Sequence, residues 1–288
     1  MPNSDTSGPM IKEPLKDLAD FAFEKAPDLC DPAIGCQGYH RFWSMLRLVQ
    51  LDGKLPRGAG FFGPQLRRVA NEKGQVRVLL AGSADTGLTC LIASQALEEG
   101  LEPSLIVVDR CATPLALNRR FADAEGLILE THQGQLQALE GLGVDAVITH
   151  NMMGFNDDDG RADILRAIGR TLRPGGRLVS IERLADTRQE KSAQDRANLL
   201  AMFEASLRKR GTNAENFAHL SAAAKVFWET NLNAGAYPES RYRAHVAAAG
   251  LSVVDLTYRR DTSLASPRAN VDMSKGLAYA YTVVERPS

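Results

Sequence analysis

The sequence lacks the features that would direct its 288 residues to a membrane, to nucleic acid or to an oxidising compartment. No apolar run approaches the roughly 20 residues that cross a bilayer, and the polar amino terminus has no signal-peptide pattern. The formal net charge is only −1, so no nucleic-acid partner held by phosphate contacts is expected. Cysteines are few and never spaced Cys-x-x-Cys: Cys30, Cys36, Cys90 and Cys111. We interpret them as small core residues, and expect a cytoplasmic protein with no metal site.

A hydrophobic fraction of 44% is enough to fill the core of one large domain. Short apolar runs alternate with helical patterns between residues 73 and 185, which is typical of a parallel sheet covered by helices on both faces. The expected strands are 76–80, 105–108, 127–132, 144–149 and 177–183. A sixth strand at 251–256 and a final one at 277–284 are expected to pair, with the last running back beside the sixth.

One strand, loop and helix, between Val76 and Asp109, indicates where a ligand binds. The loop after the first strand reads Gly82-Ser83-Ala84-Asp85-Thr86-Gly87. Gly82 allows a sharp turn, Ala84 stays small beside a ligand, and Gly87 lets helix and strand pack closely. Asp109 ends the next strand, about where nucleotide folds place a carboxylate for a ribose hydroxyl, roughly 20 residues further on.

Three features resemble the class I S-adenosylmethionine-dependent methyltransferases. They are the strand, loop and helix between Val76 and Asp109, the strand preceded by Pro174-Gly175-Gly176, and the pair of strands at the carboxy terminus. The resemblance covers about residues 73–185 and 239–288. It implies an α/β fold: a Rossmann-like seven-stranded, mostly parallel sheet with helices on both faces, an antiparallel carboxy-terminal strand, and a helical cap. In that family the loop usually reads acid-x-Gly-x-Gly-x-Gly. This chain lacks the leading acid and has Ala84 in place of one glycine.

The resemblance also implies the cofactor, S-adenosyl-L-methionine, and the residues that hold it. Asp109 would bind the ribose hydroxyls, Arg110 would lie along the adenine, and the Gln135 amide would accept a hydrogen bond from the adenine amino group. The expected cofactor-binding set is Gly82, Ser83, Ala84, Asp85, Gly87, Asp109, Arg110, Gly134, Gln135, His150 and Asn151. His150 follows the fourth strand, beside the reactive methyl in such folds. It is the first candidate for a general base, followed by Tyr39 and His40.

The implied activity is in-line methyl transfer to a small-molecule acceptor, which needs no metal. Some enzymes of this fold use other carbons of the sulfonium, moving the aminocarboxypropyl group or closing it into a ring with release of methylthioadenosine. Gly82-x-Ala84-x-x-Gly87 also loosely fits the dinucleotide fingerprint of an NAD(P)-dependent oxidoreductase. Ala84 would crowd a pyrophosphate, however, and no Tyr-x-x-x-Lys pair is present. A non-catalytic protein that only binds the cofactor is a further alternative.

Two helical segments flank the cofactor-binding core in the sequence. Residues 1–72 contain helical patterns, and the one at 38–51 has an apolar stripe formed by Tyr39, Phe42, Trp43 and Leu46. Residues 186–238 are a helical insertion whose apolar stripes need a partner surface. We expect the two segments to form a lid, with Trp228 or Tyr237 lining the acceptor pocket, or the insertion to serve a homodimer.

Overall fold

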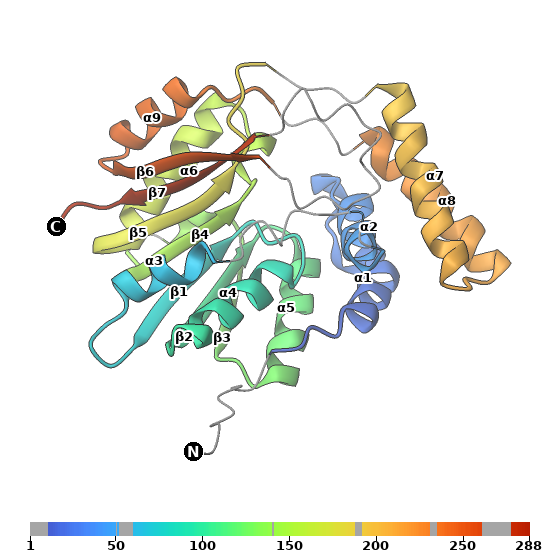
Figure 1. The fold of residues 1–288 in the computed structure, drawn as a ribbon, viewed down its shortest axis with the longest axis horizontal. Helices are drawn as coiled ribbons and strands as arrows, with labels where there is room; N and C mark the ends of the chain where they lie inside the picture. Colours follow the sequence, from blue (N-terminus) through green and yellow to red (C-terminus); the bar gives the residue numbers. More distant parts are fainter. Residues whose placement is uncertain are drawn as a thin grey trace, which may run out of the picture.

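The computed structural model describes residues 11–49, 51, 60–139, 141–187, 192–230, 235–260 and 278–288. Within these residues, seven strands form one sheet in the order β3-β2-β1-β4-β5-β7-β6 (Figure 1). The strands are β1 (Gln75–Ala81), β2 (Glu102–Asp109), β3 (Leu129–Gln133), β4 (Val144–His150), β5 (Leu172–Glu182), β6 (Ser252–Arg260) and β7 (Ala278–Glu285). β1 to β5 run parallel, and β7 is antiparallel to both its neighbours. The expected α/β fold with an antiparallel carboxy-terminal strand is confirmed.

Helices cover both faces of this sheet. The α-helices in the described ranges, including those of a further layer, are α1 (Leu15–Leu29), α2 (Gln37–Leu48), α3 (Phe62–Val69), α4 (Gly87–Glu98), α5 (Ala112–Glu125), α6 (Asp158–Thr171), α7 (Ala193–Lys209), α8 (Ala214–Thr230) and α9 (Glu239–Ala248). Leu66 of α3 and Ile92 of α4 share one core with Val78 and Leu80 of β1. The intervening Leu79 belongs to a second core, with residues of α6 and α9. Because successive side chains of a strand point to opposite faces, the unbroken apolar run of β1 supplies both cores.

The amino-terminal helices and the insertion form one further layer. Phe42 of α2 packs with Phe203 of α7, and with Phe227 and Trp228 of α8. The helix α1 of this layer also shares a small core with α5, which joins the layer to the sheet domain. Figure 1 shows α7 and α8 beyond α1 and α2, at the end of the molecule away from β6. The two segments that flank the core in sequence therefore lie side by side, whereas their action as a lid stays a prediction.

The fifth strand differs from the expectation at its start. The helix before it ends at Thr171, and β5 begins at Leu172 rather than at Arg177. Pairing with β4 then skips from Leu172 to Arg177, so Pro174-Gly175-Gly176 forms an irregularity within the strand. A Cβ at Gly176 would lie 2.9 Å from the Arg173 carbonyl oxygen, so no larger residue fits this bend without movement.

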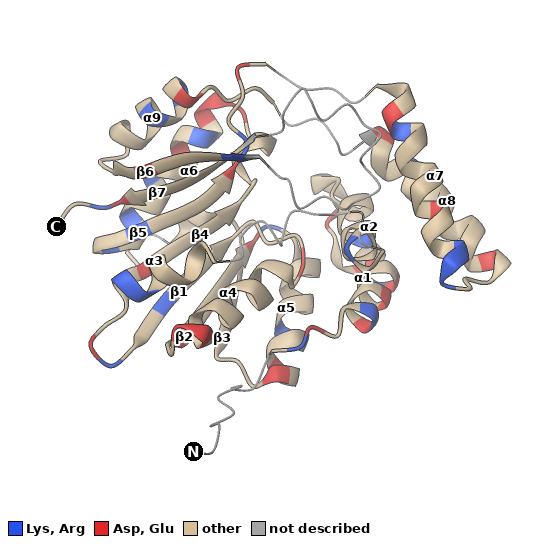
Figure 2. Ribbon diagram, viewed as in Figure 1, with Lys and Arg blue, Asp and Glu red and all other residues tan. Residues whose placement is uncertain are grey.

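Charged residues of both signs are mixed over the outer helices. Lys and Arg alternate with Asp and Glu along α1, α7 and α8 (Figure 2). Such mixing offers no stripe of a single sign for a phosphate backbone on these helices. None of the helices in the described ranges is long and apolar enough to cross a membrane.

Candidate functional site

A cavity of about 600 Å³ opens where β1, β2 and β4 end. The strand order reverses between β1 and β4, and open parallel sheets bind ligands at such a switch point, outside the carboxyl ends of the strands. The volume is in the range of small-molecule and cofactor sites. Of the predicted site residues, those that line it are Tyr39, His40, Gly82, Ser83, Ala84, Asp85, Asp109, Arg110, Gly134, Gln135, His150 and Asn151.

The loop after β1 forms the floor of the cavity. Gly82 has φ +70°, a conformation that L side chains rarely adopt, and a Cβ there would lie 2.7 Å from Met152 Sδ. Ser83 Oγ donates a 2.6 Å hydrogen bond to the Asp85 carbonyl and so closes the turn. Gly87 does not line the cavity. It is the first residue of α4, and its N–H donates to Asp85 Oδ1 at 2.9 Å.

Asp85 lines the cavity, but its carboxylate holds the loop to the amino-terminal helices. Oδ1 accepts from the Gly87 N–H, while Oδ2 accepts from Ser44 at 3.1 Å and from Arg47 at 2.6 Å. Arg47 also pairs with Glu13, which in turn accepts from the Thr86 hydroxyl. Both Asp85 oxygens accept hydrogen bonds from the protein, so this side chain fixes the shape of the loop. A direct contact between Asp85 and the cofactor stays a prediction.

Asp109 ends β2 at the wall of the cavity. Its Oδ1 accepts the Cys111 N–H at 2.8 Å, whereas Oδ2 has no hydrogen-bond partner among the described residues. Burial raises the pKa of Asp109 to about 6. The backbone of Gly134, at φ +151°, donates to the Asp109 carbonyl at 2.9 Å and brings Gln135 to the same wall. An available carboxylate oxygen and an amide thus lie at neighbouring strand ends, as the ribose and adenine assignments require.

His150 ends β4 and Asn151 follows it, across the cavity from Asp109. Asn151 has φ +52°, a left-handed conformation that asparagine tolerates better than most residues. Its N–H donates to the Ile181 carbonyl at 2.7 Å, but its side-chain Oδ1 is buried without a partner among the described residues. A buried acceptor of this kind is costly unless a ligand donates to it. The residues present therefore fit a ligand that carries hydrogen-bond donors, as S-adenosylmethionine does.

Glu182, which no sequence pattern singled out, ends β5 and binds residues on both sides of this loop. It is 1% exposed, and its carboxylate accepts from Thr149 Oγ1 at 2.9 Å and from the Met153 N–H at 3.2 Å. Burial raises the pKa of Glu182 to about 7, although both hydrogen bonds act in the opposite direction. The folded protein consequently holds this proton more tightly than the unfolded chain does.

We expect Glu182→Gln to reduce the loss of stability between pH 5 and pH 8. The pKa of Glu182 is raised from 4.5 to about 7 in the folded protein. The contribution of protonated Glu182 to the free energy of unfolding is therefore complete below pH 4.5 and is lost as the pH rises through 7. The glutamine keeps an acceptor for Met153 and cannot ionise, so roughly 2–3 kcal/mol of the decline in unfolding free energy should disappear. Urea unfolding at both pH values measures this. Glu102→Gln, at the exposed start of β2, is the control, and an unchanged decline in Glu182→Gln contradicts the prediction.

Aromatic side chains line another part of the cavity. Tyr39 stacks on Trp43, with ring centroids 5.1 Å apart, and meets Phe155 edge-on at 6.3 Å. All three line the cavity, the first two from α2 and the third from η4 (Met153–Phe155). The expectation that Trp228 or Tyr237 lines it is wrong. Trp228 belongs to the core between α2, α7 and α8, and Tyr237 is buried against Tyr242 and His245.

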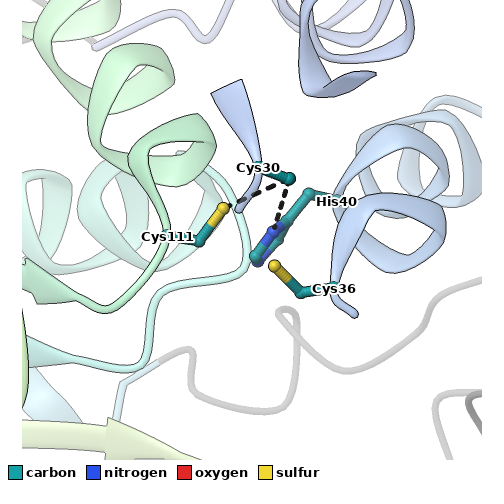
Figure 3. A group of neighbouring side chains, drawn as sticks. All are labelled: Cys30, Cys36, His40 and Cys111. Carbon is teal, nitrogen blue, oxygen red and sulfur yellow. Dashed lines mark hydrogen bonds between the residues drawn. The ribbon is translucent and has the colours of Figure 1, made fainter. Parts of the chain in front are cut away.

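His40 lies among three of the four cysteines rather than at the centre of the cavity. His40 is 6% exposed, and its Nδ1 is 3.6 Å from Cys30 Sγ (Figure 3). Cys36 and Cys111 complete this group, and only Cys90 lies apart. As expected of core residues, Cys30 and Cys111 are buried and Cys36 packs against them, but the sequence did not predict that the three lie in one group with His40. Local spacing did not reveal the group because Cys111 comes from a distant segment.

The cavity also uses residues that the sequence analysis did not select. They come from the segment 152–164 and from the turns before α2 and after β3: Ile34, Gly35, Leu136, Gln137, Met152, Phe155, Asn156, Gly160, Asp163 and Ile164. Met152 followed directly on two selected residues, so its position at the strand end was an available signal. The others are ordinary helix and turn residues whose direction depends on the packing of α6 and η4.

No protein-family model and no curated protein sequence matches this chain. Solved structures match its fold. A Burkholderia thailandensis 1,6-didemethyltoxoflavin-N1-methyltransferase with bound 1,6-didemethyltoxoflavin and S-adenosylhomocysteine is 16% identical, with TM-score 0.52 over 90% of this chain and 92% of its own. An O-methyltransferase family 2 protein from Planctomyces limnophilus, in complex with apigenin, is 18% identical, with TM-score 0.52 over 86% and 62%.

A third similar structure is a chain of the Haloferax volcanii complex that contains the Trm112 methyltransferase activator. It is 15% identical, with TM-score 0.56 over 87% of this chain and 97% of its own. At these identities the comparison concerns the fold alone. The chain has the Rossmann-like fold of the class I S-adenosylmethionine-dependent methyltransferases.

Proposed function

We propose that this protein is an S-adenosylmethionine-dependent methyltransferase that transfers the methyl group in line to a small-molecule acceptor. The observation that carries the proposal is the cavity at the ends of β1, β2 and β4. It combines the Gly82 turn, the available Asp109 oxygen and the buried, unpartnered Asn151 oxygen. The similar solved structures support it, since several are methyltransferases crystallised with this cofactor or its product.

Each part of the cofactor has a residue of matching chemistry. Asp109 Oδ2 is available to accept from the ribose hydroxyls, and Gln135 can accept from the adenine amino group. The turn at Gly82 leaves room for the methionine portion, where Asn151 Oδ1 suits its ammonium group. The bound sulfonium supplies an electrophilic methyl group. The chain's task is to hold an acceptor in line with it, which by itself can lower the barrier by roughly 7–11 kcal/mol.

The acceptor would lie between the strand ends and the aromatic side chains of the cavity. Tyr39, Trp43 and Phe155 offer flat apolar surfaces, which favour a planar or largely apolar small molecule. His150, at the end of β4, is the candidate general base for an acceptor that must lose a proton, a role worth about 10²–10⁴-fold in rate. Tyr39 is a second candidate, because its side chain lines the same cavity from α2.

Calorimetric titration with S-adenosylmethionine, followed by mass spectrometry of the incubated cofactor, tests the proposal. Binding with slow formation of S-adenosylhomocysteine is the expected result, and it justifies a screen of aromatic acceptors. Formation of methylthioadenosine would instead favour use of the other carbons of the sulfonium. Binding without turnover of any acceptor would favour a non-catalytic role. Binding of NAD(P) in place of S-adenosylmethionine would overturn the proposal.

A further inference from the structure

Three thiols and one imidazole converge between the amino-terminal helices and the core. The Sγ atoms of Cys30, Cys36 and Cys111 and a ring nitrogen of His40 all lie within 4.8 Å of one another (Figure 3). Cys30 follows α1, Cys36 precedes α2, and Cys111 precedes α5. The ends of three helices thus bring these side chains to one point. The apolar packing of small residues does not require such a convergence.

We propose that these four side chains form a tetrahedral site for Zn²⁺. Three cysteines and one histidine are one of the usual donor sets of structural zinc, and soft thiolate donors select against magnesium and calcium. With bonds of about 2.3 Å to sulfur and 2.0–2.1 Å to nitrogen, neighbouring ligand atoms in such a site lie about 3.5–3.8 Å apart. The observed separations of 3.6 Å between Cys30 and His40 and 3.2 Å between Cys30 and Cys111 need only small adjustments.

The surroundings of Cys111 and Cys30 suit a metal ligand. Cys111 lies at the amino terminus of α5, where the helix dipole stabilises a thiolate. Thr113 Oγ1 is 3.1 Å from Cys30 Sγ and can donate to it when that sulfur is charged. A charged sulfur is what a zinc ion requires, because only the thiolate is a ligand.

A disulfide between Cys30 and Cys111 is the competing explanation for part of this group. It would use two of the four side chains and draw the sulfurs to about 2.05 Å, well below the observed 3.2 Å. It would leave Cys36 and His40 without a reason to join them. A zinc site uses all four donors and closes the coordination shell, so the ion would be structural rather than catalytic.

The zinc site also adjoins the cavity, so it should affect cofactor binding; this consequence rests on the proposed function. Cys111 donates its N–H to Asp109 Oδ1, and Cys36, His40 and Cys111 also line the cofactor cavity. An ion held there would fasten α1 and α2 to the start of α5 and fix the wall that carries Asp109. Removal of zinc should therefore weaken binding of S-adenosylmethionine.

Elemental analysis of the full chain, purified under reducing conditions without chelator, is the direct test. We expect about one zinc per chain, most of it lost in Cys36→Ser. Cys90→Ser is the matched control, because Cys90 lies in α4 outside the group, and it should retain the metal. Replacement of zinc by Co²⁺ should give the visible bands and sulfur-to-metal absorption of a tetrahedral thiolate site, absent from Cys36→Ser.

Three results would overturn the site. The first is wild-type protein that is folded by circular dichroism but contains no zinc and gives no cobalt spectrum. The second is equal metal loss in Cys36→Ser and Cys90→Ser. The third is a Cys30–Cys111 disulfide found by peptide mapping of protein purified without reductant, together with no metal. Metal content does not depend on any cofactor, so these measurements separate failure of the zinc site from failure of the methyltransferase proposal.

Discussion

Asp109→Ala is expected to weaken binding of S-adenosylmethionine by roughly 100-fold or more. A carboxylate that accepts hydrogen bonds from two ribose hydroxyls contributes about 1.5–3 kcal/mol per bond, and alanine removes both. Calorimetric titration of wild type and variant measures the difference. Glu130→Gln, which removes an exposed carboxylate on β3 outside the cavity, should leave the affinity unchanged.

His150→Ala provides the contrast within the same cavity. If His150 acts as a base rather than as a cofactor ligand, the variant keeps its affinity for the cofactor and loses turnover. Asp109→Ala with undiminished affinity would remove the ribose assignment. The variant must also retain the wild-type melting temperature, since Asp109 accepts a hydrogen bond from Cys111 at the start of α5.

Arg47→Ala is expected to lower the free energy of unfolding by about 3–5 kcal/mol. The Arg47 side chain is 10% exposed and binds two carboxylates, Asp85 at 3% exposure and Glu13 at 11%. Alanine would leave both charges buried without a cation, and that penalty exceeds the loss of the hydrogen bonds themselves. Urea unfolding followed by circular dichroism measures the effect.

Lys16→Ala is the matched control for this prediction. Lys16 pairs with Asp20 along α1, where both side chains are largely exposed, so its removal should change stability little. A second readout comes from the cofactor, since Asp85 holds the loop that begins at Gly82. Arg47→Ala should bind S-adenosylmethionine more weakly even at temperatures where it remains folded. A variant as stable as wild type would contradict the prediction. It would mean that the two carboxylates become hydrated or protonated when Arg47 is removed.

The patterns along the chain determined the fold class of this protein. Apolar runs such as 105–108, separated by helical periods, predicted a parallel sheet covered on both faces. The two strands that follow Gly250 predicted the antiparallel end of the sheet. These features depend on backbone hydrogen bonding and on the alternation of side chains, which act over a few neighbouring residues. The position of the cavity followed as well, because polar residues at the ends of parallel strands gather at one edge.

Only the tertiary structure decided which distant side chains meet. Arg47 reaches Asp85 because α2 packs against the loop after β1, and Cys111 joins Cys30 and His40 because α5 begins where α1 ends and α2 starts. No local period encodes such meetings. They depend on how whole segments pack, where many weak contacts are summed over helices far apart in the chain. For the same reason Trp228 entered a core between helices, while Phe155, an ordinary turn residue in the sequence, came to line the cavity.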